Sequence, residues 1–341
     1  MVGLGDELVT GLPCRRRESD VAMRRVAVLG IAFLLTVPLC AQVSPGPVSP
    51  QSRAGRQPQR SAPRRARALW VWGSSLLEKP EELESLLAFT ARKQIRTIFL
   101  SAATKRLQQE PEVYRRALRR AHARGFQVQA LNGEPEWIFP DRRSGAVAFL
   151  EALQQYNRES RPAERFDAIH LDVEPQSLPQ WGTGGREELS GLYLAFVDWS
   201  RKRARSLALP LAVDVPISFK RIAVGGRPLY RAVLDRVDQM AVMAYKDTPE
   251  KVLEGSRADV EYGAATGKKV WVGLSADPAH LPSGSPGGSA ESDLERIALA
   301  VEGAFRHRRS FLGVAIHDYN LYRRLPPLPQ AQSSHLSRQE N

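Results

Sequence analysis

The stretch FDAIHLDVEPQ, residues 167–177, alternates polar and aliphatic side chains. His170, Asp172 and Glu174 occupy alternate positions, and aliphatic residues fill the positions between them. In an extended strand, successive side chains point to opposite faces, so the three polar side chains would share one face. That face is solvated on an edge strand, but in a closed barrel it points into the barrel. The rest of the chain decides between these two interpretations.

Short apolar or β-branched runs recur along the chain, separated by longer stretches with apolar residues at helical spacing. Strand and helix alternating in this way predict a parallel sheet, and a span of about 250 residues is typical of a (β/α)8 barrel. No glycine-rich loop follows the first run, which argues against a doubly wound nucleotide-binding sheet. We therefore predict an α/β fold, a single TIM-barrel domain over residues 68–325. The eight predicted strands are 68–73, 97–102, 126–132, 168–174, 211–216, 239–245, 269–275 and 313–319.

In such a barrel the polar face of residues 168–174 points inward, and Glu174 lies at the carboxyl end, where barrel enzymes carry out their chemistry. Burying these groups without partners would cost several kcal/mol, which favours a functional role. Asp172 and Glu174 lie side by side, about 7 Å apart between Cα atoms, so one charge raises the pKa of the other. Two such carboxyls cannot flank a glycosidic bond from opposite sides. They suit a mechanism in which the carbonyl oxygen of an N-acetyl sugar is the nucleophile.

This stretch resembles the chitinase-like family 18 glycoside hydrolases, whose fourth strand carries D-x-x-D-x-D-x-E. Asp167, Asp172 and Glu174 match three of the four positions, and His170 replaces the second acid. The resemblance extends over the whole predicted barrel in layout but rests on short motifs.

The predicted sixth strand is similar too, because family members carry M-x-Y-D there. MAYKD supplies Met243 and Tyr245, with Asp247 displaced by one position. The eighth strand departs from the family, which usually has a tryptophan near its end, where this chain has His317.

The resemblance implies a role for each matching residue. Glu174 would protonate the leaving oxygen, Asp172 would hold the N-acetyl group, and Tyr245 would steady the intermediate. It implies a polysaccharide or glycan as the substrate, no cofactor and no metal, and we expect a monomer.

Further polar and aromatic residues at strand ends could line the same mouth. Asp214 is the strongest of these, since it points inward if its valine neighbours face the helices. Trp181 could stack on a sugar ring. We expect His170 to be an interior partner of Asp172. The remaining candidates are Trp70 or Trp72, Asn132, Glu134, Glu136, Trp137 and Asp277.

Three alternatives stay open. Glu174 followed by Pro175 also resembles the acid/base of the large retaining glycosidase clan, but only Asp277 follows the seventh strand, where that clan has glutamate. Family 25 muramidases share D-x-E, yet the first strand lacks their aspartate. A non-catalytic carbohydrate-binding barrel is the third; the presence of Glu174 favours an enzyme. Metal-dependent chemistry would need clusters that six scattered histidines do not provide.

The N-terminal region has the pattern of an export signal. MRRVAVLGIAFLLTVPLCAQ combines two arginines, a short apolar run and small residues at its end. We predict a signal region over residues 1–41, with Met23 as the start and cleavage after Ala41. The product would be exported and not inserted in a membrane. Lipid anchoring at Cys40 is less expected, because Leu39 precedes it.

After cleavage the protein would contain no cysteine, since Cys14 and Cys40 both precede the cut. Residues 42–67, rich in Pro, Ser and Arg, are predicted to be a disordered linker, and residues 326–341 a disordered tail.

The net charge of +12 does not indicate a nucleic-acid partner. Six arginines and no acidic residue lie in residues 42–68, and basic residues outnumber acidic ones by only five in residues 69–341. The folded part is therefore weakly basic.

Overall fold

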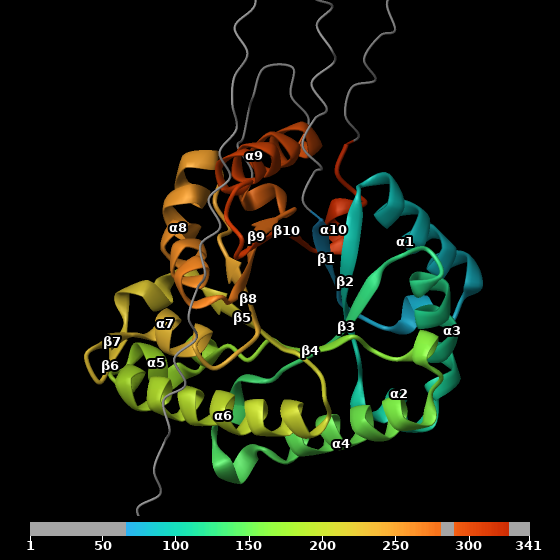
Figure 1. Ribbon diagram of the computed structural model, residues 1–341, viewed down its shortest axis with the longest axis horizontal. Coiled ribbons are helices and arrows are strands. Elements are labelled where there is room, and N and C mark those ends of the chain that lie inside the picture. The colour runs from blue at the N-terminus through green and yellow to red at the C-terminus, as the bar shows by residue number, and fades with distance from the viewer. Residues whose placement is uncertain (1–65, 281–289, 327–341) are drawn as a thin grey trace, which may run out of the picture. The chain divides into compact units, whose positions relative to one another are not determined.

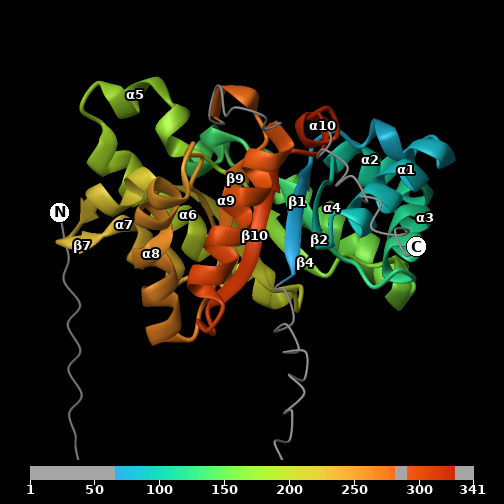
Figure 2. The same cartoon turned by 90° about the horizontal axis from the view of Figure 1, so that it is seen from above.

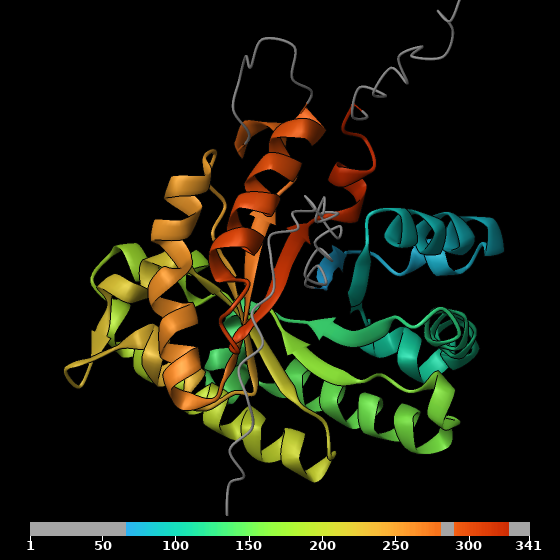
Figure 3. The same cartoon turned by 45° about the horizontal axis from the view of Figure 1, so that its top comes forward.

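The computed structural model of the chain describes residues 66–280 and 290–326. The predicted signal region, the linker up to residue 65 and the tail from residue 327 lie outside the described residues. Figures 1 and 3 show the strands gathered at the centre and the helices around them.

Eight parallel strands close a barrel in the order β1-β10-β9-β8-β5-β4-β3-β2. The first and last strands complete the ring, with Ala68 opposite Ala315. This confirms the predicted TIM barrel. The strands are β1 (Arg67–Val71), β2 (Ile95–Ser101), β3 (Gln127–Asn132), β4 (Ala168–Leu171), β5 (Leu211–Pro216), β8 (Gln239–Met243), β9 (Lys269–Ser275) and β10 (Phe311–His317). A separate antiparallel pair joins β6 (Ala223–Val224) and β7 (Arg227–Pro228).

The helices cover the outside of the barrel with their apolar faces. In the first of them, Leu83, Leu86 and Leu87 recur at helical spacing and are at most 2% exposed. Figure 2 shows that α5 and α10, which follow the ends of β4 and β10, lie on the same side of the barrel. The helices are α1 (Pro80–Arg92), α2 (Thr104–Gln109), α3 (Pro111–His122), α4 (Ser144–Glu159), α5 (Pro179–Gly182), α6 (Arg186–Ser206), α7 (Leu229–Leu234), α8 (Pro249–Thr266), α9 (Ala290–Phe305) and α10 (Tyr319–Tyr322).

The core has two layers, as expected for a small barrel that is filled by side chains. The larger layer lies between the strands and the helices. The smaller layer fills the barrel interior and contains Trp70, Phe99, Leu131 and Trp271. The interior is therefore a packed core, and a substrate can enter only at the ends of the strands.

The predicted linker extends too far at its last residue. Arg67 begins β1 and is only 4% exposed. Its guanidinium forms ion pairs with Glu295 (Nη1 to Oε2, 2.6 Å) and Glu302 (Nε to Oε1, 2.7 Å), both from α9. An arginine in a Pro- and Arg-rich run looks like linker in the sequence, and only these partners, far along the chain, place it in the barrel.

Over residues 66–280 and 290–326, no helix has the length and apolar character needed to cross a membrane.

Candidate active site

The backbone after β4 places two carboxyl groups at the carboxyl end of the barrel. β4 ends at Leu171, three residues before the predicted end, and the chain continues through Asp172 and Glu174 into a 3-10 turn at Pro175–Ser177. The Asp172 amide still donates to the Asn132 carbonyl (3.1 Å). Gly133 makes this close approach possible, because a Cβ there would lie 1.9 Å from the Asp172 carbonyl oxygen.

A pocket of about 290 Å³ opens at this end of the barrel. Its residues come from the ends of five strands that are far apart in the sequence. Both carboxyl groups after β4 line it, as predicted from their alternation. The lining residues are Trp70, Asp172, Glu174, Asp214, Pro216, Met243, Tyr245 and His317.

The pocket favours the protonated form of both carboxyl groups. Burial raises the pKa of Glu174, the charge of Asp214 adds to this rise, and the Gln176 amide, which donates to Glu174, opposes it. Burial raises the pKa of Asp172 well above its usual range, and the charges of Asp214 and Glu174 add to it. The two neighbouring carboxyl groups thus act on each other, as the sequence suggested, and the charge of Asp214 of β5 adds to the effect on both.

Tyr245 supplies a hydroxyl group on the β8 side of the pocket. Burial raises the pKa of this phenol well above its usual range, and nearby carboxylates add to the rise, so the hydroxyl keeps its proton. The ring lies against His317 (5.5 Å between ring centroids) and stacks on His280 (6.2 Å). A Cβ on Gly273 would lie 3.3 Å from Tyr245 Cε1, so this glycine leaves the ring its space.

His317 lies at the end of the eighth barrel strand, β10. Trp72 Nε1 donates to His317 Nε2 (3.1 Å), and Trp70 lies edge-on to the same ring (5.9 Å between centroids). Burial lowers the pKa of His317, which keeps Nε2 available as an acceptor. Trp72 therefore acts on the pocket through His317 and does not line it.

The floor of the pocket shows an error in the sequence-based prediction. His170 is fully buried, and its ring nitrogens face Gln129 Oε1 (2.8 Å) and Asp214 Oδ1 (2.9 Å). It does not bond Asp172, whose Oδ1 has no hydrogen-bond partner among the described residues. Asp214 is the partner because β5 lies next to β4 in the barrel. Gln129 could not be recognised as a partner of His170 from the sequence, where its position inside a predicted strand is the only signal.

Three more predicted substrate-binding residues lie outside this pocket, as His170 and Trp72 do. Asp247 pairs with Lys251 (2.8 Å), and its side chain is 44% exposed. Trp181 belongs to α5 and stacks on Phe219 (6.0 Å between centroids), so that face is occupied by packing. Glu134 is exposed.

Of the weaker candidates, Trp70 lines the pocket and the following four lie outside it. Trp137 stacks on Phe149 (6.3 Å between centroids), and Asn132 donates to the Ala102 carbonyl (3.0 Å). Glu136 and Asp277 are absent from the residues that line the pocket.

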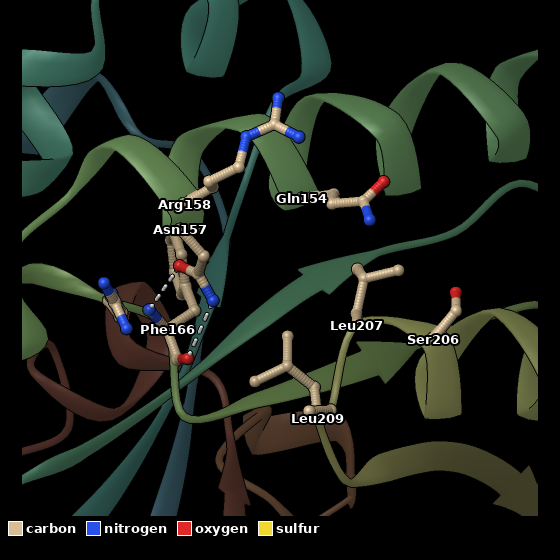
Figure 4. Close-up of a pocket in the computed structure, with 9 residues that line it drawn as sticks. Gln154, Asn157, Arg158, Phe166, Ser206, Leu207 and Leu209 are labelled. Carbon is tan, nitrogen blue, oxygen red and sulfur yellow. Dashed lines mark hydrogen bonds between the residues drawn. The ribbon is translucent and has the colours of Figure 1, made fainter.

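A second pocket, of about 360 Å³, lies at the opposite, amino end of the strands (Figure 4). Asn157 spans its wall, donating to the Phe166 carbonyl (3.2 Å) and accepting from the Phe166 amide (3.0 Å). It has no carboxylate or nucleophilic pair, and barrel enzymes do not use this end for chemistry. The lining residues are Gln154, Asn157, Arg158, Arg165, Phe166, Ser206, Leu207, Ala208 and Leu209.

Metal-ligand clusters are absent from the described ranges: they contain no group of three or more His, Cys, Asp or Glu side chains that could hold an ion.

Comparison with known proteins relates the chain to others by its fold. No family model and no curated protein matches its sequence. A GH18 chitinase from Pseudoalteromonas aurantia is similar in structure, with a TM-score of 0.50 at 12% identity, over 74% of this chain and 94% of that one. ICChI chitinase from Ipomoea carnea (TM-score 0.45, 15% identity, 75% and 96% covered) is also similar. The PgaB (BpsB) glycoside hydrolase domain from Bordetella bronchiseptica is similar too, with a TM-score of 0.46 at 12% identity, over 76% of this chain and 94% of that one. The likeness to the Pseudoalteromonas chitinase shows that this chain shares its (β/α)8 barrel fold.

Proposed function

We propose that the protein is a glycoside hydrolase that cleaves N-acetylhexosamine-containing polysaccharide by substrate-assisted acid catalysis. The observation that supports this most is the meeting of Asp172, Glu174 and Tyr245 in one pocket at the carboxyl end of the barrel. Raised pKa values of both carboxyl groups supply the protonated acid that such a reaction needs. A pocket of about 290 Å³ is near the lower end of the range for small ligands and suits one sugar ring.

In the first step Glu174 donates its proton to the glycosidic oxygen, and the bond from that oxygen to the anomeric carbon breaks. The carbonyl oxygen of the sugar's own N-acetyl group forms the new bond to the anomeric carbon. Asp172 holds the N-acetyl group in place, and the Tyr245 hydroxyl donates to its carbonyl oxygen. In the second step water attacks the anomeric carbon and gives its proton to Glu174, and the bond from that carbon to the N-acetyl oxygen breaks. The configuration is retained over the two steps.

We also propose that the mature protein begins after cleavage at Ala41 and is exported. It acts on a glycan as a monomer without a cofactor. Anchoring through Cys40 is the less favoured form.

The N-acetyl group gives the sharpest test of this mechanism. The wild-type protein should cleave a β-linked N-acetylglucosamine oligomer at least about 10³-fold faster than the same oligomer with free amines, because only the first carries the internal nucleophile. Product release would be followed by chromatography. Equal rates on the two substrates would contradict substrate assistance.

Tyr245→Phe should reduce kcat about 10²-fold, because one hydrogen bond to the reacting carbonyl oxygen is lost from a buried site. The ring packing against His317 and His280 is kept, so Tm should stay close to wild type. A loss of kcat below threefold would exclude the assigned role of the hydroxyl.

A non-catalytic carbohydrate-binding barrel is the second candidate. It is favoured by the two departures from the family motifs, His170 in place of an acid and Asp247 outside the pocket. Glycan binding without cleavage, measured calorimetrically, would support it over hydrolysis.

A further inference from the structure

A chain of hydrogen bonds crosses the barrel interior below the pocket. Trp271 Nε1 donates to Gln239 Oε1 (3.1 Å), and Gln129 Nε2 donates to the same oxygen (3.1 Å). Gln129 Oε1 faces His170 Nδ1 (2.8 Å), and His170 Nε2 faces Asp214 Oδ1 (2.9 Å). At the far end, Trp70 Nε1 donates to Asp214 Oδ2 (3.0 Å). Six strands contribute to this chain.

Two donor-only groups fix the direction of these bonds. An indole N–H cannot accept, so Trp271 requires the oxygen of Gln239 to face it. Because that oxygen can only accept, the group of Gln129 that faces it must be the amide nitrogen. Gln129 Oε1 then faces His170. A carbonyl oxygen can only accept, so His170 Nδ1 must carry a hydrogen. Trp70 in turn requires Asp214 Oδ2 to accept.

The contact between His170 Nε2 and Asp214 Oδ1 therefore needs one further proton. If it were absent, two lone pairs would face each other at 2.9 Å in a fully buried site. Such an arrangement costs several kcal/mol in a dry interior. The proton is on His170 Nε2 or on Asp214 Oδ1, and in both cases the pair has no net charge.

We propose that Gln129 is a positioning residue that makes His170 and Asp214 share one proton, and so offsets the negative charge of Asp214 beneath Asp172 and Glu174. The effect of Gln129 on catalysis rests on the function proposed above, whereas the proton shared by His170 and Asp214 does not depend on that function.

The groups around the pair are few and come from several elements. Aromatic rings of Trp70 and Phe99 pack on His170, at 6.3 and 4.1 Å between centroids. The charge of Asp214 acts on Asp172, Glu174, Tyr193, Tyr245 and His317. A change in the charge of the pair would therefore act directly on the acid residues.

Removing the acceptor should change the tautomer of His170. In Gln129→Met, Nδ1 has no carbonyl oxygen as an acceptor. A neutral His170 can therefore carry its hydrogen on Nε2 and donate it to the Asp214 carboxylate. The pair then has a net charge of −1. That charge should raise the pKa of Glu174 by about one unit. The limb at which activity falls with rising pH should move up by the same amount.

The test uses ¹⁵N-histidine-labelled protein and NMR of the His170 ring nitrogens, assigned by elimination from variants of the other five histidines. In wild type, Nδ1 should carry a hydrogen, because Gln129 Oε1 can only accept. In Gln129→Met the neutral Nε2–H form should appear. Gln129→Glu is the matched control, because its carboxylate still accepts from Nδ1 and should keep that hydrogen.

A remote variant removes the concern that changes at Gln129 disturb folding. Trp271→Phe does not touch His170 but frees Gln239 and Gln129 to turn, so part of the Nε2–H form should appear there too. A neutral Nε2–H form in wild type would overturn the proposal, and so would a Gln129→Met variant that keeps Nδ1 protonated. If no glycan is cleaved at all, the pKa of Glu174 is measured by ¹³C NMR instead of from a pH–rate profile. A pKa of Glu174 that is the same in Gln129→Met as in wild type would contradict the effect on the acid.

Discussion

Glu174→Gln should lower the hydrolysis of a β-linked N-acetylglucosamine oligomer by about 10²–10⁴-fold, the usual contribution of a general acid. The amide keeps the shape of the side chain and removes its transferable proton. Glycan binding should survive, because the pocket wall is unchanged. The measurement is kcat from product release, with Kd from calorimetry on the same preparation.

Glu134→Gln is the matched control for that variant. Glu134 also follows a strand at the carboxyl end of the barrel, but it is exposed and lies outside the pocket. Its kcat should equal that of wild type. If Glu174→Gln were as active as wild type, Glu174 would not be the acid.

Asp172→Asn should have the next largest effect, a loss of about 10²–10³-fold in kcat, because an amide, unlike the carboxyl group, cannot take on negative charge beside the N-acetyl nucleophile as the new bond forms. KM should change less than kcat, since the orienting interaction matters most when the new bond forms. Unchanged kcat would show that Asp172 does not hold the reacting group.

The same variant should be more stable than wild type at neutral pH. Because the folded pKa of Asp172 lies above its unfolded value, the folded state binds more protons, and wild-type stability falls as pH rises from about 4 through the folded pKa. Asparagine removes this loss, so the free energy of unfolding should rise by about 1–3 kcal/mol. Each kcal/mol should raise Tm by about 2–4 °C.

The gain should vanish below about pH 4, where the aspartate is protonated in both states. Thermal melts at several pH values test this. A variant less stable than wild type at neutral pH would mean that the Asp172 carboxylate has a stabilising partner.

Much of the barrel could be predicted from local patterns, and the reasons are physical. Each central strand is buried on both sides, so its apolar run is visible without knowledge of its neighbours. The alternation of polar and aliphatic residues at His170, Asp172 and Glu174 likewise indicated that these polar side chains point into the barrel. The end of β4 could not be seen, because the alternation of polar and aliphatic residues continues through Val173 and Glu174 although the strand ends at Leu171.

The partners inside the barrel could not be predicted, because they depend on which strands are adjacent. His170 and Asp214 are 44 residues apart, and Gln129 and Gln239 are 110 apart. Trp181 shows the opposite error: a tryptophan in a glycine-rich loop suggested a sugar platform, but Phe219 occupies its face. One inserted residue, Lys246, separates Tyr245 from Asp247, which pairs with Lys251 instead of lining the pocket.

The most direct test of the central claim is to incubate the purified wild-type protein with N-acetylglucosamine oligomers and to follow the products by NMR. The account predicts shorter oligomers whose new reducing ends first appear as the β-anomer, since the N-acetyl oxygen and then water each attack with inversion. Oligomers that bind but remain intact after prolonged incubation, or products that first appear as the α-anomer, would contradict it.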